Sequence, residues 1–315
     1  MKKVIVFGGA NIDIIGRSDS KLISYDSNIG KVIQTFGGVG RNIAENIVRY
    51  GIDVHFVSVL GNDINGHNCI KYCQDLGMNM DDCMIIEGEN TSTYLAVLDD
   101  SGDMHVAIND MDILRFMNVD HISKVLSKVN KEDLIVLDTN LDQEIIDYIL
   151  DYAPCPIYVD PISCNKCSKI KNKLNKIHVL KPNIFEASSL TNVEYNGIDS
   201  VKRMGQQLIE QGVDEVCISL GSEGSMYFSK EKWFRVKSDV VEVANATGAG
   251  DAFMGAMVAS DVLEYDLERK LKFASSASIC TIETGASVCR ELSIDFVSER
   301  MDNIKFKIKE EELCF

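Results

Sequence analysis

Short apolar runs alternate with amphipathic stretches along most of this chain. The runs are rich in valine, isoleucine and leucine and cover residues 4–7, 54–60, 134–138, 157–160, 178–181 and 215–220. Runs of this kind, separated by segments of helix length, predict buried parallel strands with crossover connections. Apolar positions recur at helical spacing between them, so we expect helices over 41–50, 64–76, 143–152 and 201–211. The pattern predicts an α/β fold with a mostly parallel central sheet.

Two other segments, 12–34 and 91–109, have a different texture. In the second, Thr93–Leu98 and 104–108 flank a polar, glycine-containing loop, which predicts a β-hairpin. β segments that are distant in sequence can pair into a small sheet, and such a sheet would suit a lid over a site that must exclude water. A plain surface hairpin is the alternative. The expected domains are a main domain over 1–11, 35–90 and 110–315 and a lid over 12–34 and 91–109.

Composition and charge narrow the function classes. With 315 residues, 45% of them hydrophobic, the chain can bury a large core, and its net charge of −16 opposes binding to a nucleic-acid polymer. No run approaches the roughly 18 uncharged apolar residues of a membrane span. Met1-Lys2-Lys3 leads directly into a four-residue apolar run rather than a signal-peptide core. We expect a cytoplasmic protein without nucleic-acid or membrane partners.

The cysteines raise one further candidate site. Ten are scattered through apolar segments, which is typical of buried thiols in a reducing compartment. Cys164 and Cys167 form a CxxC pair, but a second pair is missing and no histidine is close in sequence. A surface loop is therefore favoured over zinc or redox chemistry.

The most informative candidate site is the segment 245–253, Asn-Ala-Thr-Gly-Ala-Gly-Asp-Ala-Phe. A strand-like run over 240–243 leads into a turn whose small residues leave space for a ligand, and Asp251 opens an apolar helical segment. Free N–H groups at a helix start favour an anion, such as a phosphoryl group in transfer. Asp251 would lie beside it and take the proton of an attacking hydroxyl. Taken alone, an ordinary glycine-rich turn capped by aspartate is the better explanation, so other motifs must decide.

A second glycine cluster, Gly37-Gly38-Val39-Gly40, precedes the expected helix over 41–50. It is an incomplete dinucleotide fingerprint, because position 43 is isoleucine where GxGxxG requires glycine. The Gly30-Lys31 pair lacks the upstream glycine of a Walker A loop. A bound nucleotide would therefore need a different scaffold, and a Rossmann oxidoreductase is disfavoured.

Five separated motifs, in order, resemble the PfkB family of ribokinase-like carbohydrate and nucleoside kinases over nearly the whole chain. The motifs are Gly9-Ala10-Asn11-Ile12-Asp13, Gly37-Gly38 with Asn42, Lys181-Pro182-Asn183 with Glu186, Ser219-Leu220-Gly221-Ser222-Glu223-Gly224, and Gly248-Ala249-Gly250-Asp251. The resemblance implies a three-layer α/β/α sandwich with a β-sheet lid. It also implies an ATP-dependent phosphotransferase with an alcohol as acceptor.

The resemblance also implies roles for the motif residues. Asp251 would be the catalytic base, beside an anion hole for the γ-phosphate made by the N–H groups of Gly248, Ala249 and Gly250. Substrate contacts would come from Asn11, Asp13 and Asn42, with Gly37 and Gly38 as the hinge of the lid. ATP contacts would come from Asn183, Ser219, Gly221, Ser222, Gly224 and Thr247.

Metal sites are implied in the same way. Asn183 and Glu186 would organise Mg²⁺ through water, which suits a hard ion that keeps much of its hydration shell. Many relatives hold a monovalent cation with an aspartate where this chain has Asn245. Asparagine can coordinate through its amide oxygen but brings one less negative charge, so K⁺ dependence stays open.

Several of these residues have simpler alternatives. Asn183 and Glu186 can merely start a helix at Ile184, and Asp13 can be a turn residue. Lys181 can be a solvated strand end. Apart from the motifs, we expect the run 307–312 to be a charged surface tail.

Within the family, Gly37-Gly38-Val39-Gly40-Arg41-Asn42 resembles the pseudouridine kinase branch more than ribokinase. That resemblance implies phosphorylation of a nucleoside 5′-hydroxyl, with Thr93 and Tyr94 of the lid as candidates for contact with the uracil ring. Kinases of free or phosphorylated sugars and a catalytically silent nucleotide-binding regulator are the alternatives. The exposed edge of the lid sheet offers a surface for a homodimer.

Overall fold

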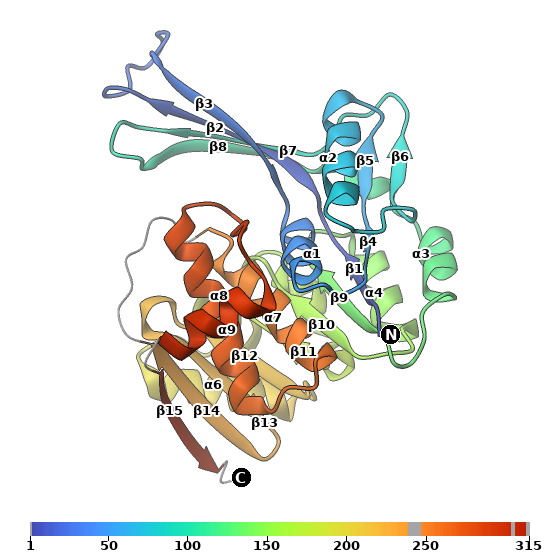
Figure 1. Ribbon diagram of the computed structural model, residues 1–315, viewed down its shortest axis with the longest axis vertical. Coiled ribbons are helices and arrows are strands. Elements are labelled where there is room, and N and C mark those ends of the chain that lie inside the picture. The colour runs from blue at the N-terminus through green and yellow to red at the C-terminus, as the bar shows by residue number, and fades with distance from the viewer. Residues whose placement is uncertain (1, 239–246, 304–305, 313–315) are drawn as a thin grey trace.

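The computed structural model describes residues 2–238, 247–303 and 306–312, and its largest element is a nine-stranded sheet (Figure 1). The strand order is β15-β14-β13-β12-β11-β10-β9-β1-β4. The strands from β12 to β4 run parallel, and β13 to β15 extend the sheet antiparallel at one edge. The bounds are β1 Val4–Phe7, β4 Val54–Val57, β9 Leu134–Asp138, β10 Ile157–Asp160, β11 Val179–Leu180, β12 Glu215–Ser219, β13 Ser225–Ser229, β14 Lys232–Ser238 and β15 Phe306–Glu312.

Helices cover both faces of this sheet, because successive strand residues point to opposite sides. Val4 and Val6 of β1 pack in one core with the helices α1, α2, α7, α8 and α9, whereas Ile5 and Phe7 pack in the other with α3 to α6. The expected three-layer α/β/α sandwich is confirmed. The bounds are α1 Val39–Arg49, α2 Ile64–Asp75, α3 Val119–Leu126, α4 Gln143–Tyr152, α5 Ile184–Thr191, α6 Ile198–Glu210, α7 Ala249–Val262, α8 Leu267–Thr284 and α9 Ile294–Asn303.

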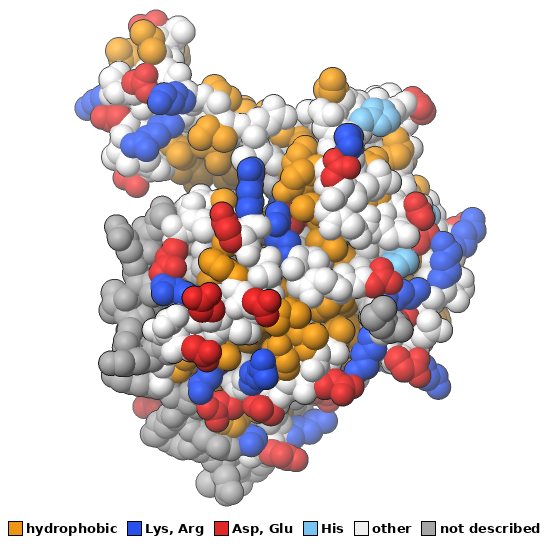
Figure 2. Space-filling view, viewed as in Figure 1, with side chains coloured by type: hydrophobic (Ala, Val, Ile, Leu, Met, Phe, Trp, Pro, Cys, Tyr) orange, Lys and Arg blue, Asp and Glu red, His pale blue; other side chains and the backbone are white. Residues whose placement is uncertain are grey.

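A separate four-stranded sheet, which we call the lid, projects from the body (Figure 1). Its order is β3 (Gly30–Gly37), β2 (Asn11–Ser18), β7 (Thr93–Leu98) and β8 (Met104–Asp110). β2 and β7 pair in parallel although they are far apart in sequence. Figure 2 shows the outer end of the lid standing clear of the body, so the lid is attached at one end.

Two predictions from the sequence are wrong in detail. The run 54–60 is divided at Ser58 into β4 and β5 (Val59–Gly61), and β5 pairs with β6 (Met84–Ile86) in a small separate sheet. Both halves are buried, so the hydrophobic pattern contains no sign of the break. The run 307–312, expected to be a surface tail, lies within β15, and edge strands accept charged residues. The run expected over 240–243 lies outside the described residues.

Two further observations concern membranes and metals. Within the described ranges, no helix is long and apolar enough to cross a membrane. Cys164 is exposed, whereas Cys167 is buried as the first residue of the short 3₁₀ helix Cys167–Ile170. Across the part of the chain that the structure describes, no three His, Cys, Asp or Glu side chains are grouped to chelate a metal ion.

Candidate active site

The Gly-Ala-Gly-Asp motif forms the start of helix α7. Gly248 precedes the helix with a φ of 81°, and a Cβ atom there would fall 1.9 Å from the carbonyl oxygen of Ser287. Glycine alone suits both the left-handed backbone and this close approach. The turn leaves the N–H groups at the start of α7 without intrahelical acceptors, beside Asp251 in the first turn.

Asp251 is a buried carboxylate with a perturbed pKa. Asp251 is only 8% exposed, and its Oδ2 accepts a 2.8 Å hydrogen bond from Nδ2 of Asn42 on α1. Burial, and after it the charge of Asp160, raises the pKa of Asp251 to about 7. The hydrogen bond from Asn42 and the cations Lys181 and Arg41 limit this rise. A carboxylate with a pKa near neutrality is well suited to accept a proton from a substrate.

Lys181 lies within the same polar cluster and is not the solvated strand end that the sequence allowed. It is 5% exposed, and its Nζ lies 3.1 Å from Oδ2 of Asp160. Burial opposes its charge, but the carboxylates of Asp160, Glu186 and Asp251 raise the pKa of Lys181 above its usual value. Asp160 and Lys181 follow neighbouring parallel strands, and that adjacency is the signal that sequence reasoning missed.

Asn183 and Glu186 form a capping box at the start of α5. Oδ1 of Asn183 accepts from the N–H of Glu186, and Oε2 of Glu186 accepts from the N–H of Asn183, both at 2.9 Å. The helix-starting alternative is therefore present in the structure. Glu186 is 3% exposed, and burial raises its pKa, which marks a carboxylate that a nearby cation would stabilise.

Asp13 and Asn11 lie at the root of the lid, on β2. Nδ2 of Asn11 donates a 2.6 Å hydrogen bond to Oδ1 of Asp13, and burial raises the pKa of Asp13 despite this bond. Gly37 is paired with Asn11 across the β2 and β3 ladder, and a Cβ at Gly37 would fall 2.3 Å from Oδ2 of Asp13. The carboxylate of Asp13 thus occupies the space that any larger residue at position 37 would fill. Asp13 belongs to a strand, not to the turn considered as its alternative.

The two lid residues expected to contact a base lie on opposite faces of the lid. Tyr94 is opposite Asp13 in the β2 and β7 ladder, whereas Thr93 is opposite the buried Ile12. Because side chains alternate along a strand, only Tyr94 shares the face of Asp13. The hydroxyl of Thr93 donates to the carbonyl oxygen of Thr91 at 3.2 Å.

Asp138, the last residue of β9, is a site residue that sequence reasoning did not single out. The fully buried carboxylate accepts hydrogen bonds from the N–H groups of Gly9, Gly40 and Asn140 at 2.8 to 2.9 Å. It joins the loop after β1 to the start of α1. Gly38 precedes α1 with a φ of 97°, and a Cβ there would fall 2.3 Å from the carbonyl oxygen of Gly9. Two of the partners of Asp138, Gly9 and Gly40, are distant from it in sequence, so no local sequence pattern predicts these contacts.

The end of β12 and the loop after it carry four of the residues expected to contact ATP: Ser219, Gly221, Ser222 and Gly224. Ser219 ends this strand and donates its N–H to Pro182 at 3.0 Å, which places the 219–224 loop beside the start of α5. Gly221 and Ser222 are exposed in a 3₁₀ turn, and Gly224 follows at a φ of 86°. Thr247 is exposed just before α7, whereas Asn245 lies outside the described residues.

Comparison with known proteins identifies this arrangement. A family model described as pfkB family carbohydrate kinase matches residues 1–291. The chain belongs to the pfkB family. Pseudouridine kinase from Escherichia coli K12 is 35% identical over 305 residues, which cover 95% of this chain and 96% of that protein.

Solved structures agree with this membership. A protein from Clostridium perfringens, assigned provisionally as a sugar kinase, is 32% identical with a TM-score of 0.88, and the match covers 99% of each chain. Ribokinase from Arabidopsis thaliana, solved with ribose and ATP, has a TM-score of 0.81 at 22% identity, over 96% of this chain and 99% of that one, which shows the shared fold. The chain is therefore a phosphotransferase of the sugar and nucleoside kinase class that uses ATP.

Proposed function

We propose that this kinase transfers the γ-phosphoryl group of ATP to the 5′-hydroxyl of a nucleoside, with pseudouridine as the preferred acceptor. The observation that carries the proposal is the buried Asp251, with its raised pKa, at the amino end of α7. The choice of nucleoside is supported by the 35% identity to the Escherichia coli pseudouridine kinase and by the Gly37-Gly38-Val39-Gly40-Arg41-Asn42 cluster.

In this mechanism Asp251 acts as the general base. Asn42 holds Oδ2, so we assign Oδ1 to receive the proton of the attacking hydroxyl as the new oxygen–phosphorus bond forms and ADP leaves. The N–H groups of Gly248, Ala249 and Gly250 stabilise the charge on the transferred group at the positive end of the α7 dipole. Lys181 adds a fixed cation, since a Cβ on Gly250 would lie 3.1 Å from its Nζ.

Mg²⁺ supplies charge neutralisation at the ATP phosphates when it is bound. Asn183 and Glu186 would hold it through water, and the buried carboxylate of Glu186 with its raised pKa fits such a neighbour. Ser219, Gly221, Ser222, Gly224 and Thr247 would line the ATP site. K⁺ use, through Asn245, stays a prediction.

The acceptor would bind between the body and the root of the lid. Asp13 and Asn11 present oxygen and amide groups suited to ribose hydroxyls, and Gly37 with Gly38 would act as the hinge. Tyr94, on the face of Asp13, is the residue that we assign to the uracil ring. Thr93 points to the other face, so we assign it no contact with the base.

We also propose a homodimer formed through the lid. Val32 and Ile108, on the edge strands β3 and β8, are 73% and 62% exposed. With Leu95 and Val106 they lie on the face opposite Asp13. A contiguous exposed apolar surface with two free strand edges suits pairing with a second copy.

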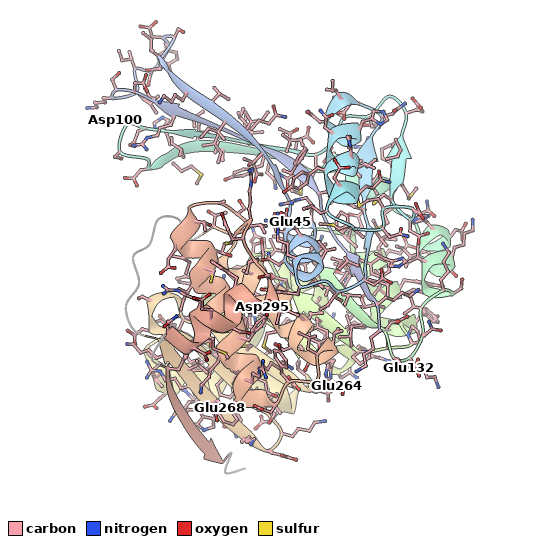
Figure 3. The ribbon with its side chains drawn as sticks, in the orientation of Figure 1. Glu45, Asp100, Glu132, Glu264, Glu268 and Asp295 are labelled. Carbon is pink, nitrogen blue, oxygen red and sulfur yellow. The ribbon has the colours of Figure 1, made fainter. Side chains whose placement is uncertain are left out.

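A kinase of a free sugar is the second candidate. A sugar phosphate is disfavoured because the basic residues of the first lid segment lie far from Asp13. Arg17 pairs with Lys31 in the ladder and donates to the carbonyl oxygen of Asp100 at 2.7 Å, and Figure 3 labels Asp100 at the outer tip of the lid.

The test measures ADP release with ATP and Mg²⁺ for pseudouridine, uridine, adenosine, ribose, fructose and fructose 6-phosphate in turn, with and without K⁺. We expect the highest kcat/KM with pseudouridine. Preference for a sugar would overturn the nucleoside assignment and leave the kinase mechanism intact. No release with any acceptor would contradict catalysis and favour the silent regulator.

A further inference from the structure

Arg41, in the first turn of α1, is one of the largest buried side chains in the structure. It is 2% exposed. A guanidinium has five N–H donors and no acceptor. Here Nε donates to the carbonyl oxygen of Gly37 and Nη2 to that of Phe36, both at 3.0 Å. Nη2 also donates to Oδ1 of Asn42, and Nη1 donates to Glu45.

The carbonyl groups of Phe36 and Gly37 end strand β3, where the lid joins the body. Both lie at the end of the β2 and β3 ladder, where donors from outside the sheet can hold the backbone in addition to strand pairing. Arg41 supplies both donors from one rigid, planar group. The guanidinium therefore fixes the backbone at the root of the lid.

The hydrogen bond to Asn42 has a second consequence. An amide side chain has an acceptor end and a donor end. Because Arg41 donates to Oδ1, Nδ2 of Asn42 faces Asp251, to which it donates at 2.8 Å. A flipped amide would place its oxygen against the carboxylate of Asp251. Arg41 thus orients the side-chain amide of Asn42 so that Nδ2, and not Oδ1, faces Asp251.

Burial opposes the charge of Glu45, and Arg41 is the largest of the influences that lower its pKa, but this ion pair does not explain the hydrogen bonds from Arg41 to the lid root. Glu45 also accepts hydrogen bonds from Nη2 of Arg49 at 2.5 Å and from the hydroxyl of Tyr72 at 2.9 Å. Figure 3 labels Glu45, which belongs to α1, below the root of the lid. With Arg49 already on this carboxylate, the buried cation at position 41 has a role that the ion pair alone does not explain.

From these contacts we propose that Arg41 is a positioning residue that couples the root of the lid to the orientation of the catalytic base through Asn42. The inference rests on the proposed role of Asp251. The charged groups that face Asp251 are Asp160, Lys181 and Arg41 itself. Among them, Arg41 alone also contacts the lid strands.

Arg41→Lys tests the proposal, with Arg49→Lys as the matched control. Lysine keeps the charge beside Glu45, but its three donors cannot serve all four partners of Arg41. Arg49 shares Glu45 and contacts neither Asn42 nor the lid root in the hydrogen bonds described. We expect Arg41→Lys to lower kcat by about tenfold to a hundredfold, with KM for ATP within about threefold. Arg49→Lys should change both kcat and KM for ATP by less than about threefold.

Two further measurements separate positioning from a general loss of stability. If Arg41 acts through Asn42, then Arg41→Lys has no added effect on kcat in an Asn42→Ala background. Arg41→Met/Glu45→Met replaces both buried charges by apolar side chains, a change that proteins often tolerate, and should show the same kcat loss if Arg41→Lys does not fold.

The side-chain carboxyl ¹³C shift of Asp251 gives a readout besides activity. The pKa of Asp251 should rise in both Arg41 variants and stay unchanged in Arg49→Lys, since the favourable hydrogen bond from Asn42 is lost only in the former. Folded Arg41 variants with unchanged kcat, or with an unchanged Asp251 titration, would overturn the proposal. A wild-type protein that phosphorylates no acceptor but shows the expected titration would instead overturn the proposed function.

Discussion

The charge on Asp251 is set by its neighbours. Burial and Asp160 favour the protonated form, whereas Asn42 and Lys181 favour the carboxylate. The balance leaves the pKa at about 7, so the same side chain can take up a proton and release it near neutral pH.

Replacement of the base should remove turnover and spare ATP binding. We expect Asp251→Asn to lower kcat by roughly 10² to 10⁴, because a general base acts in the transition state. ATP affinity, measured by calorimetry, should stay within about threefold. Asp133→Asn is the control. Asp133 is a buried aspartate that directly precedes the first residue of β9, and its variant should keep near wild-type kcat. A kcat for Asp251→Asn equal to that of this control would contradict the assignment.

The pH profile should report the same carboxylate. Since the ionised form accepts the proton, kcat/KM should fall as the pH drops below about 7. Lys181→Met removes a cation that lowers this pKa, so its acid limb should move to higher pH. An acid limb that lies at the ordinary aspartate value of about 3.9 would show that another group limits the rate.

The raised pKa also predicts a cost in stability. The folded state binds a proton on Asp251 up to about pH 7, whereas the unfolded state releases it above the ordinary aspartate pKa of 3.8. Stability from this group is therefore lost as the pH rises between these values. Asp251→Asn should raise Tm at pH 8 and raise it less at pH 5, as measured by calorimetry. An equal change at both pH values would contradict the linkage.

At the scale of elements, strand alternation decides which lid residues reach the substrate. Tyr94 shares a face with Asp13, and Thr93 does not. We expect Tyr94→Ala to raise KM for pseudouridine by about tenfold or more, in line with the roughly 1–3 kcal/mol of base stacking on an aromatic ring. Thr93→Val, the control from the opposite face, should change KM by less than about threefold. A larger rise in KM for Thr93→Val than for Tyr94→Ala would show that Thr93 faces the nucleoside.

Hydrophobic periodicity predicted many elements closely, because both core faces of the sheet are apolar. The helix expected over 143–152 is α4 (Gln143–Tyr152), and the strand expected over 4–7 is β1. The break at Ser58 was missed, since buried residues continue on both sides of it. Helix α1 starts at Val39 rather than at Arg41, which places Arg41 and Asn42 in its first turn.

The sequence motifs predicted part of the set of residues that lie together in the candidate site. Asn42 and Asp251 were both expected at the substrate, and the structure joins them at 2.8 Å. Neither the contacts of Asp138 nor the place of Lys181 beside Asp160 could be read from the sequence. Their partners lie on strand ends and loops that meet only in the folded sheet.

At the scale of the whole molecule, the lid face opposite Asp13 carries exposed apolar side chains on both edge strands. If two copies pair through it, Val32→Asp/Ile108→Asp should give monomers in analytical ultracentrifugation, because charges would be buried in the interface. Ile64→Asp, at a position 75% exposed on α2, is the control and should leave the dimer intact. A wild-type protein that sediments as a monomer at micromolar concentration would contradict the dimer.

The most direct test of the central claim is a competition in one reaction. Equal concentrations of pseudouridine, uridine and ribose are mixed with ATP, Mg²⁺ and the protein. The phosphorylated products are separated by chromatography and identified against authentic standards, because the two nucleoside phosphates have the same mass. We expect pseudouridine 5′-phosphate to form first and the Asp251→Asn variant to form no detectable product. Ribose phosphate as the main product, or equal product from the variant, would contradict the central claim.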